Sequence, residues 1–397
     1  MNLMMKSAAL LAPALALATP AFAGYSNSDV AGLADPSQPG SVLVWPKFVT
    51  GSVPVFAGTS GAFNAAKTVI ELGAVCPAAL GPNGCTDNQT IHVHLHWVCP
   101  GVQVGQQTSV CQETDFTVPI TFGSSSAGKI TFNPGSGSGT ITGPTPSDYN
   151  GSTIVPIAPC PRGYLIGYAV DNEDRPVKFD GLIGDAVQRS WGTDLQSESA
   201  IAIQADPNLP NWEASNDSSG ASVIKLDTNG GLIFDGGSKH YQMVTGQLQG
   251  DVAFDSNLTA PFHNGALVLL TLDVKSGLQN DTTAVALDFY NYYEAQLSTE
   301  ATFDCWGQFE LESLDPNLTV ENFGSQTLNG AAGARHDKGM FISGQAIDAV
   351  TGKQRTLLGL FQGSEGPTGG AANSSNSYQI RPGNNSVPIP TEFVPFE

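Results

Sequence analysis

The sequence predicts an all-β protein made of two consecutive antiparallel β-sandwich modules of the Ig-like or jelly-roll type. Gly and Pro are abundant, with 45 and 26 residues, and only 13% of the residues are charged, so few segments favour long helices. Short runs of β-branched and aromatic residues recur between clusters of Gly, Pro, Asn, Asp and Ser. Runs of this kind, punctuated by turn residues, are typical of β-sandwiches.

These runs predict two series of strands. The segment 283–297 also fits a helix, but Val285, Leu287 and Phe289 alternate with other residues and therefore favour a strand. The first series covers 41–49, 67–72, 90–99, 115–122, 129–132, 163–170 and 200–205, and the second covers 223–226, 266–274, 283–297, 301–314, 340–347 and 356–362.

A loose internal repeat supports the division into two modules. Residues 40–45 resemble 265–270, and 163–169 resemble 339–346, in the same order along the chain; chance similarity between β-strands is the alternative. The predicted units are a signal peptide at 1–23, an N-terminal segment at 24–37, a first module at 38–205, a connector at 206–262, a second module at 263–365 and a flexible or extended tail at 366–397.

The first 23 residues have the build of a secretory signal. Lys6 supplies the positive start, an Ala/Leu-rich run follows over 8–18, and Ala21-Phe22-Ala23 offers a cleavage site before Gly24. The apolar run is shorter than the roughly 20 residues of a membrane-spanning helix. We therefore expect a bacterial protein without a transmembrane segment that is exported to the periplasm, the cell surface or the medium.

Six cysteines lie in the predicted mature chain, an even number that suits disulfides in an oxidising compartment. Cys76 with Cys85 and Cys99 with Cys111 would each close a short loop, which leaves Cys160 with Cys305. A zinc site is the alternative, but no C-x-x-C pair is present. We expect three disulfides, although the sequence does not fix their pairing.

The chain is acidic, with 36 Asp and Glu against 16 Lys and Arg and a formal net charge of −20. Nucleic acid is not an expected partner, because phosphate binding needs clustered Lys and Arg. Divalent cations are expected partners, because the carboxylates of acidic loops offer oxygen ligands for Ca²⁺. These loops lie at 171–174, 251–255 and 315–317. Ordinary hairpin turns explain the same residues.

The most specific local pattern is Ile91-His92-Val93-His94-Leu95-His96-Trp97. Side chains alternate on a strand, so the apolar residues should face a core while His92, His94 and His96 form a row on the opposite face. Neighbouring imidazoles in such a row lie near enough to share Zn²⁺ or Cu²⁺. An exposed or intermodule histidine face without metal is the alternative.

No G-x-S-x-G or H-E-x-x-H motif is present, so the common hydrolase signatures are missing and the sequence favours a non-enzyme. Carboxylate pairs such as Asp288 with Glu294 have the chemistry of a glycosidase but fit surface charge equally well. A sugar-stacking platform could form from Tyr290, Tyr292, Tyr293 and Trp306.

The strand at 40–48, the step from Cys111 to Phe116 and the segment 163–186 together resemble an uncharacterised group of secreted bacterial β-sandwich proteins. The resemblance covers mainly the first module. It implies a secreted β-sandwich and brings no activity that transfers to any residue here.

Three hypotheses follow. The first is a non-catalytic extracellular or cell-surface protein that acts in adhesion, matrix or appendage assembly, with self-association through an extended segment such as 389–396. The second is a metal-binding protein or metalloenzyme centred on His92, His94 and His96. The third is a glycan-binding module with surface glycans as partners.

Overall fold

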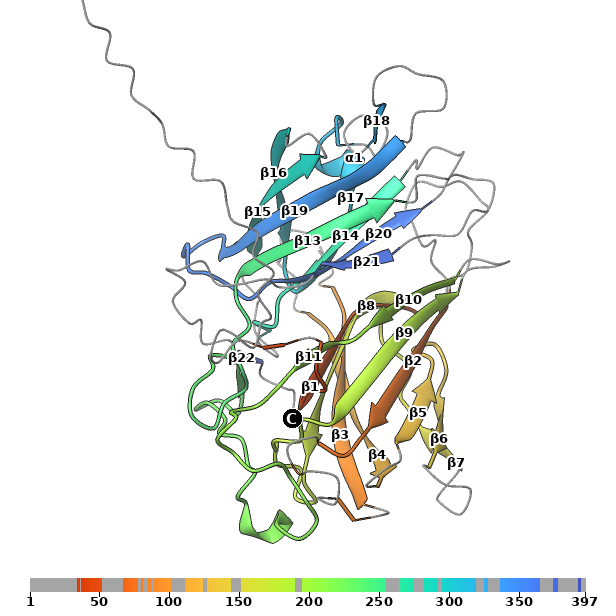
Figure 1. Ribbon diagram of the computed structural model, residues 1–397, viewed down its shortest axis with the longest axis vertical. Coiled ribbons are helices and arrows are strands. Elements are labelled where there is room, and N and C mark those ends of the chain that lie inside the picture. The colour runs from red at the N-terminus through yellow and green to blue at the C-terminus, as the bar shows by residue number, and fades with distance from the viewer. Residues whose placement is uncertain are drawn as a thin grey trace, which may run out of the picture.

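Antiparallel sheets form almost all of the regular structure, as the sequence predicts (Figure 1). The computed structural model describes residues 34–35, 37–51, 67–77, 80, 85–86, 89–100, 111–123, 127–143, 151–189, 195–254, 264–274, 282–291, 295–318, 325–327, 336–364, 374–377 and 392–393. The predicted signal peptide lies outside these residues. Within the described residues, no helix is long and apolar enough to span a membrane.

The first sandwich consists of two facing sheets. The central sheet has the spatial order β11 (Ile201–Ile203), β1 (Val42–Val49), β8 (Arg162–Val170), β3 (Gln89–Val98) and β4 (Glu113–Phe122). The outer sheet has the order β10 (Leu195–Ser199), β9 (Leu182–Arg189), β2 (Lys67–Ala74), β5 (Gly128–Phe132), β6 (Ser138–Thr142) and β7 (Gly151–Ile154).

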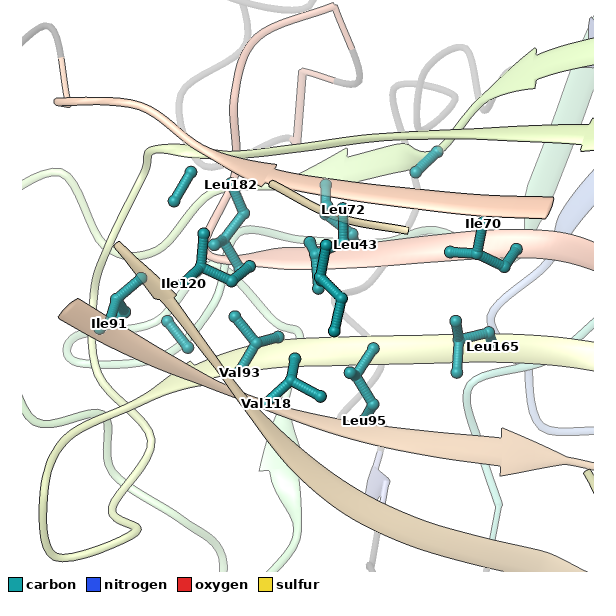
Figure 2. Close-up of a cluster of buried hydrophobic side chains, with 14 of the residues drawn as sticks. Leu43, Ile70, Leu72, Ile91, Val93, Leu95, Val118, Ile120, Leu165 and Leu182 are labelled. Carbon is teal, nitrogen blue, oxygen red and sulfur yellow. The ribbon is translucent and has the colours of Figure 1, made fainter. Parts of the chain in front are cut away.

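A first hydrophobic core fills the space between these two sheets. Figure 2 shows Ile70 and Leu72 of the outer sheet facing Leu95 and Leu165 of the central sheet. All four side chains are buried, and full burial of each such side chain stabilises the fold by about 1.5–3 kcal/mol.

The second sandwich follows the same layered plan. One sheet has the order β13 (Gln247–Phe254), β19 (His336–Asp348), β15 (Thr283–Asn291) and β16 (Gln296–Phe303), and β18 (Ser325–Thr327) also pairs with β19. The other has the order β17 (Trp306–Glu310), β14 (Asn264–Leu270), β20 (Leu358–Ser364) and β21 (Ser374–Ser377). A separate core that includes Leu267, Phe289 and Phe361 lies between them.

The central sheet is buried on both faces, because its second face packs against the second sandwich. Val44 and Ile166 share a core with Val268 and Leu360. Two hydrogen bonds cross the same interface: the Tyr164 hydroxyl donates to the carbonyl of Thr271 at 3.2 Å, and the Trp306 indole donates to the carbonyl of Pro46 at 2.8 Å. The two sandwiches therefore share one continuous hydrophobic interface.

The predicted connector is a folded part of this interface. Its Leu232, Phe234 and Tyr241 side chains are buried in the core between the sandwiches. It contains the 3-10 turn η3 (Asp217–Ser219) and the strand β12 (Leu232–Ile233), which pairs with β22 (Glu392–Phe393) near the chain end. β13 also begins before residue 263, where the sequence predicts the start of the second module.

Three disulfides are present, and their pairing corrects two of the three expected pairs. Cys76 bonds Cys85 as expected, but Cys99 bonds Cys160 and Cys111 bonds Cys305. Pairing of β3 with β4 places Val98 opposite Glu113 and Cys99 opposite Gln112. Because side chains alternate along a strand, Cys99 and Cys111 point to opposite faces of the central sheet.

The same alternation decides where each cysteine finds its partner. Cys160 packs against the first core, whereas Cys111 and Cys305 lie in the core between the sandwiches. Cys111 with Cys305 thus closes a separation of 194 residues and joins the first sandwich to the second.

Several predicted strands have different limits in the structure. The segment 283–297 is a hairpin of β15 and β16 rather than one strand, and 301–314 contains β17 and the short helix α1 (Leu311–Leu314). The segment 223–226 forms only an isolated bridge at Val223. Polar strands such as β6, β9 and β10 escape the sequence pattern because their Ser, Thr, Gln and Asp residues resemble loops.

The predicted internal repeat does not match the topology. β1 and β8, which carry the first-half segments, are hydrogen-bonded neighbours in one sheet. β14 and β19, which carry the second-half segments, lie in different sheets. Their similarity therefore reflects shared strand composition and not equivalent positions.

Candidate functional site

The histidine row lies on β3 as the sequence predicts. Ile91, Val93, Leu95 and Trp97 are fully buried in the first core. The histidines point to the other face, toward the side on which the second sandwich packs. Their exposure falls along the strand: the His94 side chain is 20% exposed and that of His96 is buried.

His96 is held by hydrogen bonds at both ring nitrogens. Nδ1 contacts Oε1 of Glu113, and Nε2 lies 3.3 Å from the hydroxyl of Tyr168. Burial lowers the pKa of His96 to about 3, and burial with the nearby charge of Glu113 raises the pKa of Tyr168 well above its ordinary value. A neutral imidazole thus donates from Nδ1 to the carboxylate and accepts at Nε2 from the phenol.

His94 is less enclosed. Its Nδ1 lies 3.2 Å from the Thr117 hydroxyl, and its Nε2 lies 3.4 Å from a carboxylate oxygen of Asp115. Its ring is 4.6 Å from that of His96, centroid to centroid, and stacks on Tyr168 at 5.4 Å. Burial and the neighbouring His96 lower the pKa of His94, against the opposing effect of Asp115.

These partners come from the strands on either side of β3. Glu113, Asp115 and Thr117 lie at alternate positions of β4, and Tyr168 pairs directly with His94 from β8. Sequence reasoning missed them, although Glu113-x-Asp115-x-Thr117 repeats the alternation of the histidines. Because His96 and Glu113 are buried, they cannot contact a substrate, and we infer that they hold this face of the sheet together.

A metal site at the row finds little support in this geometry. Zinc binds a lone pair of a neutral imidazole, and both nitrogens of His96 already have protein partners. Across the described residues, no group of three or more His, Cys, Asp or Glu is arranged to hold a metal ion. His240 Nδ1 lies 2.7 Å from a carboxylate oxygen of Asp235.

The acidic loops at 171–174 and 315–317 behave as turns. The Asp171 carboxylate accepts from the backbone nitrogens of Glu173 and Arg175 at 2.9 Å and from the Arg175 guanidinium at 2.7 Å. Asp315 accepts from the backbone of Asn317 at 2.7 Å. The predicted loop at 251–255 is wrong for residues 251–254, which belong to strand β13, and residue 255 lies outside the described residues.

The predicted aromatic platform is divided by the fold. Trp306 is buried between the sandwiches, with Arg162 stacked 5.9 Å from its ring. Tyr292, Tyr293 and Glu294 lie outside the described residues. Tyr290 instead pairs with Phe341 of the adjacent strand, with ring centroids 6.1 Å apart.

Polar residues surround this ring pair on the outward face of the β13–β19–β15–β16 sheet. Phe289 of β15 is buried, so Asp288 and Tyr290 point outward. The Asp288 carboxylate accepts hydrogen bonds from the Ser298 hydroxyl at 2.6 Å and the Gln296 amide at 2.9 Å. The register continues this polar row through Ser343 of β19 and Gln249 of β13.

Comparisons with known proteins add little to these observations. No family model matches the chain, and no curated protein matches it. Among solved structures, a lectin from Pleurotus ostreatus in complex with GalNAc is 9% identical over 85% of each chain, with a TM-score of 0.18. A similarity this low carries no argument about fold or function.

Proposed function

We propose that the protein is a secreted, non-catalytic protein of the bacterial cell surface or medium that acts in adhesion, matrix or appendage assembly. The observation that carries this proposal is the joining of the two sandwiches. They share a continuous hydrophobic core and the Cys111–Cys305 disulfide. Two sandwiches joined in this way resist separation from each other under force. This property suits a protein that bears mechanical load or presents binding surfaces outside the cell.

Other features support the same function. Disulfides are typical of exported proteins, and the predicted signal peptide would direct export. His94 and His96 of the histidine row contact side chains of the same chain, which favours a structural role for them. These side chains are Glu113, Tyr168, Asp115 and Thr117. Self-association stays a prediction, since Glu392 and Phe393 of the predicted extended segment pair with β12 of the same chain.

The test is to delete the gene in the native bacterium and to measure surface attachment and the protein's location. We expect the protein to be accessible to added protease on intact cells or present in the medium, and attachment to fall in the deletion strain. Wild-type protein should restore attachment and a Cys111→Ser/Cys305→Ser variant should not. The matched control is Cys76→Ser/Cys85→Ser, which opens a separation of only 9 residues. A cytoplasmic protein with free thiols would contradict the proposal.

A second candidate is glycan binding through the outward face around Tyr290 and Phe341. Aromatic rings stack on the apolar faces of sugars, and adjacent carboxylates, amides and hydroxyls bind their hydroxyl groups. Asp288, Gln296 and Ser298 supply these polar groups beside the ring pair.

Calorimetric titration with a polysaccharide panel tests this candidate. A binding polysaccharide should lose at least about tenfold in affinity with Tyr290→Ala, since loss of one stacking ring costs about 1.4 kcal/mol or more. Thr302→Ala, on the same sheet face two register rows from Asp288, is the matched control and should bind as wild type does. Equal affinity of both variants would exclude this face as the binding site.

A further inference from the structure

Strand β7 forms one end of the outer sheet of the first sandwich (Figure 1). Among the described residues it pairs only with β6, and no strand is hydrogen-bonded to its other edge. An open edge presents unpaired backbone N–H and C=O groups that can bind a further strand. The edge of β7 is therefore a candidate surface for strand addition.

The pairing with β6 shows which backbone groups of β7 face the open edge. The backbone nitrogen of Val155, directly after β7, donates to the carbonyl of Gly137, directly before β6, at 3.4 Å. Hydrogen-bonded and non-hydrogen-bonded positions alternate in an antiparallel pair, so Thr153 also directs its backbone groups toward β6. Ser152 and Ile154 consequently direct their N–H and C=O groups away from β6, into the open edge.

Two other edge strands of the first sandwich carry residues that hinder strand addition. β4, at one end of the central sheet, contains Glu113, Asp115 and Pro119. β10, at the opposite end of the outer sheet from β7, contains Glu198. Charges at an edge oppose pairing with another chain, and proline lacks the N–H that pairing needs. β7 consists only of Gly, Ser, Thr and Ile, so it lacks this protection.

Apolar side chains are exposed at the same edge. Ile154, at the end of β7, is 85% exposed, and Ile157, three residues further along the chain, is 59% exposed. Ile154 pairs with Ser138 of β6, which is also exposed, so both side chains lie on the outward face of the sheet. Ile154 would therefore gain from burial against a partner that extends the sheet.

The charge distribution favours a second copy of this chain as that partner. The chain has a formal net charge of −20, so two copies repel each other where their charged surfaces meet. Residues 130–161, which include β6 and β7, contain one charged residue, Asp148. Two copies can thus approach at this edge with little repulsion, whereas a basic partner would find its complement on the acidic surfaces instead.

We propose that β7 is a self-association edge, at which a second copy of the chain adds its own β7 in antiparallel orientation. A two-fold axis at Thr153 pairs Ser152 of each copy with Ile154 of the other, and the residues of each pair exchange both backbone hydrogen bonds. The two outer sheets then form one continuous sheet. The Ile154 side chains of the two copies lie diagonally across the axis on one face, within contact range.

The association through this edge is weak and reversible, because a strand of four residues buries less area than a permanent dimer needs. Weak contacts of this kind suit assembly where many copies are held close together. The proposal thus deepens the proposed function in matrix or appendage assembly and rests on it for its role in the cell. The pairing itself is a property of the purified protein.

Sedimentation of the disulfide-bonded mature protein over a range of concentrations tests the proposal. We expect a reversible equilibrium in which the average mass rises toward twice that of one chain. Ile154→Lys should weaken the dimer at least about tenfold, because it removes the apolar contact and brings like charges together across the axis. Val350→Lys is the matched control, since Val350 is 82% exposed in the second sandwich, and it should keep the wild-type affinity.

A cysteine at the two-fold axis tests the register. Opposite residues of a non-hydrogen-bonded antiparallel pair have Cα atoms about 4.5 Å apart, which lies within the range of about 4.4–6.8 Å for disulfides. Thr153→Cys should therefore form a disulfide-linked dimer under mild oxidation, much faster than Val350→Cys does. Equal rates for the two variants would contradict the proposed pairing.

The outcomes separate this edge from the proposed function. A wild-type protein that stays monomeric at every concentration would overturn the proposal and leave the edge to a strand of another protein. A dimer that Ile154→Lys and Val350→Lys keep equally would place self-association elsewhere and overturn it as well. A monomer in solution together with lost attachment in the gene-deletion strain would reject the edge but not the proposed function. A dimer through β7 without an attachment defect would do the reverse.

Discussion

Strand β3 presents two faces that are stabilised in different ways. On one face Ile91, Val93, Leu95 and Trp97 enter the first core, where hydrophobic burial depends on area and shape. On the other face His94 and His96 are joined to specific partners from β4 and β8. The comparison teaches that an apolar face needs only neighbours, whereas a buried polar face needs a partner for each polar atom.

The largest expected effects concern the disulfides of Cys111 and Cys99, whose side chains point to opposite faces of the central sheet and whose loss should lower the free energy of unfolding by different amounts. Replacing Cys111 and Cys305 by Ser opens a separation of 194 residues and should lower the free energy of unfolding by about 5 kcal/mol on a chain-entropy estimate. Replacing Cys99 and Cys160 opens 61 residues and should cost about 4 kcal/mol. Urea unfolding of both variants measures the difference, and a larger loss for the Cys99 and Cys160 variant would contradict this order.

The next largest loss of stability is expected when a large side chain on the apolar face of β3 is truncated. Trp97→Ala removes a fully buried ring that packs 4.9 Å from Phe48 and donates to the carbonyl of Pro156 at 3.0 Å. We expect a loss of about 3–5 kcal/mol from the cavity and the lost burial. Trp97→Phe keeps most of the apolar volume and serves as the control in the same denaturation experiment. Equal losses would show that the indole hydrogen bond, and not the cavity, dominates.

Low pH should reduce the contribution that the histidine face of β3 makes to the free energy of unfolding. The pKa of His96 is lowered from 6.5 to about 3 by burial, so below pH 6.5 the unfolded chain binds a proton that the folded chain does not. This contribution to stability is present above pH 6.5 and is lost as the pH falls toward 3. Between pH 6.5 and 5 the loss should reach about 2 kcal/mol.

Unfolding measured across this pH range tests the assignment. His96→Gln should reduce the slope of stability against pH, because the titrating group is absent from both states. A variant that keeps the wild-type slope would place the acid sensitivity in other groups.

The smallest effect is expected for His94, the middle residue of the row. His94→Ala removes a contact with Asp115, whose side chain is 46% exposed, so solvent screens the interaction and the loss should stay below about 1 kcal/mol. Elemental analysis of the same variant and of wild type addresses the metal hypothesis. About one equivalent of Zn or Cu in wild type that disappears with His94→Ala would contradict our structural interpretation of the row.

The local pattern of a strand carried much of what the sequence could predict. Alternation over residues 91–97 gave the correct division between core and histidine face, and turn-punctuated runs gave the all-β fold. Polar strands such as β9 and β10 were missed because their packing, rather than their composition, makes them strands. The partners Glu113 and Tyr168 of His96 were missed for a related reason, since they belong to other strands.

The sequence by itself determined the fold class, the number of cysteines and the faces of β3, because backbone geometry fixes the period of two at every strand. Only the tertiary structure decided that Cys111 bonds Cys305, that the predicted connector is packed between the sandwiches, and that the charged residues Lys47 and Glu198 are buried. These outcomes depend on which distant segments pack together. Such contacts are set by the register and stacking of whole sheets, which no local pattern encodes.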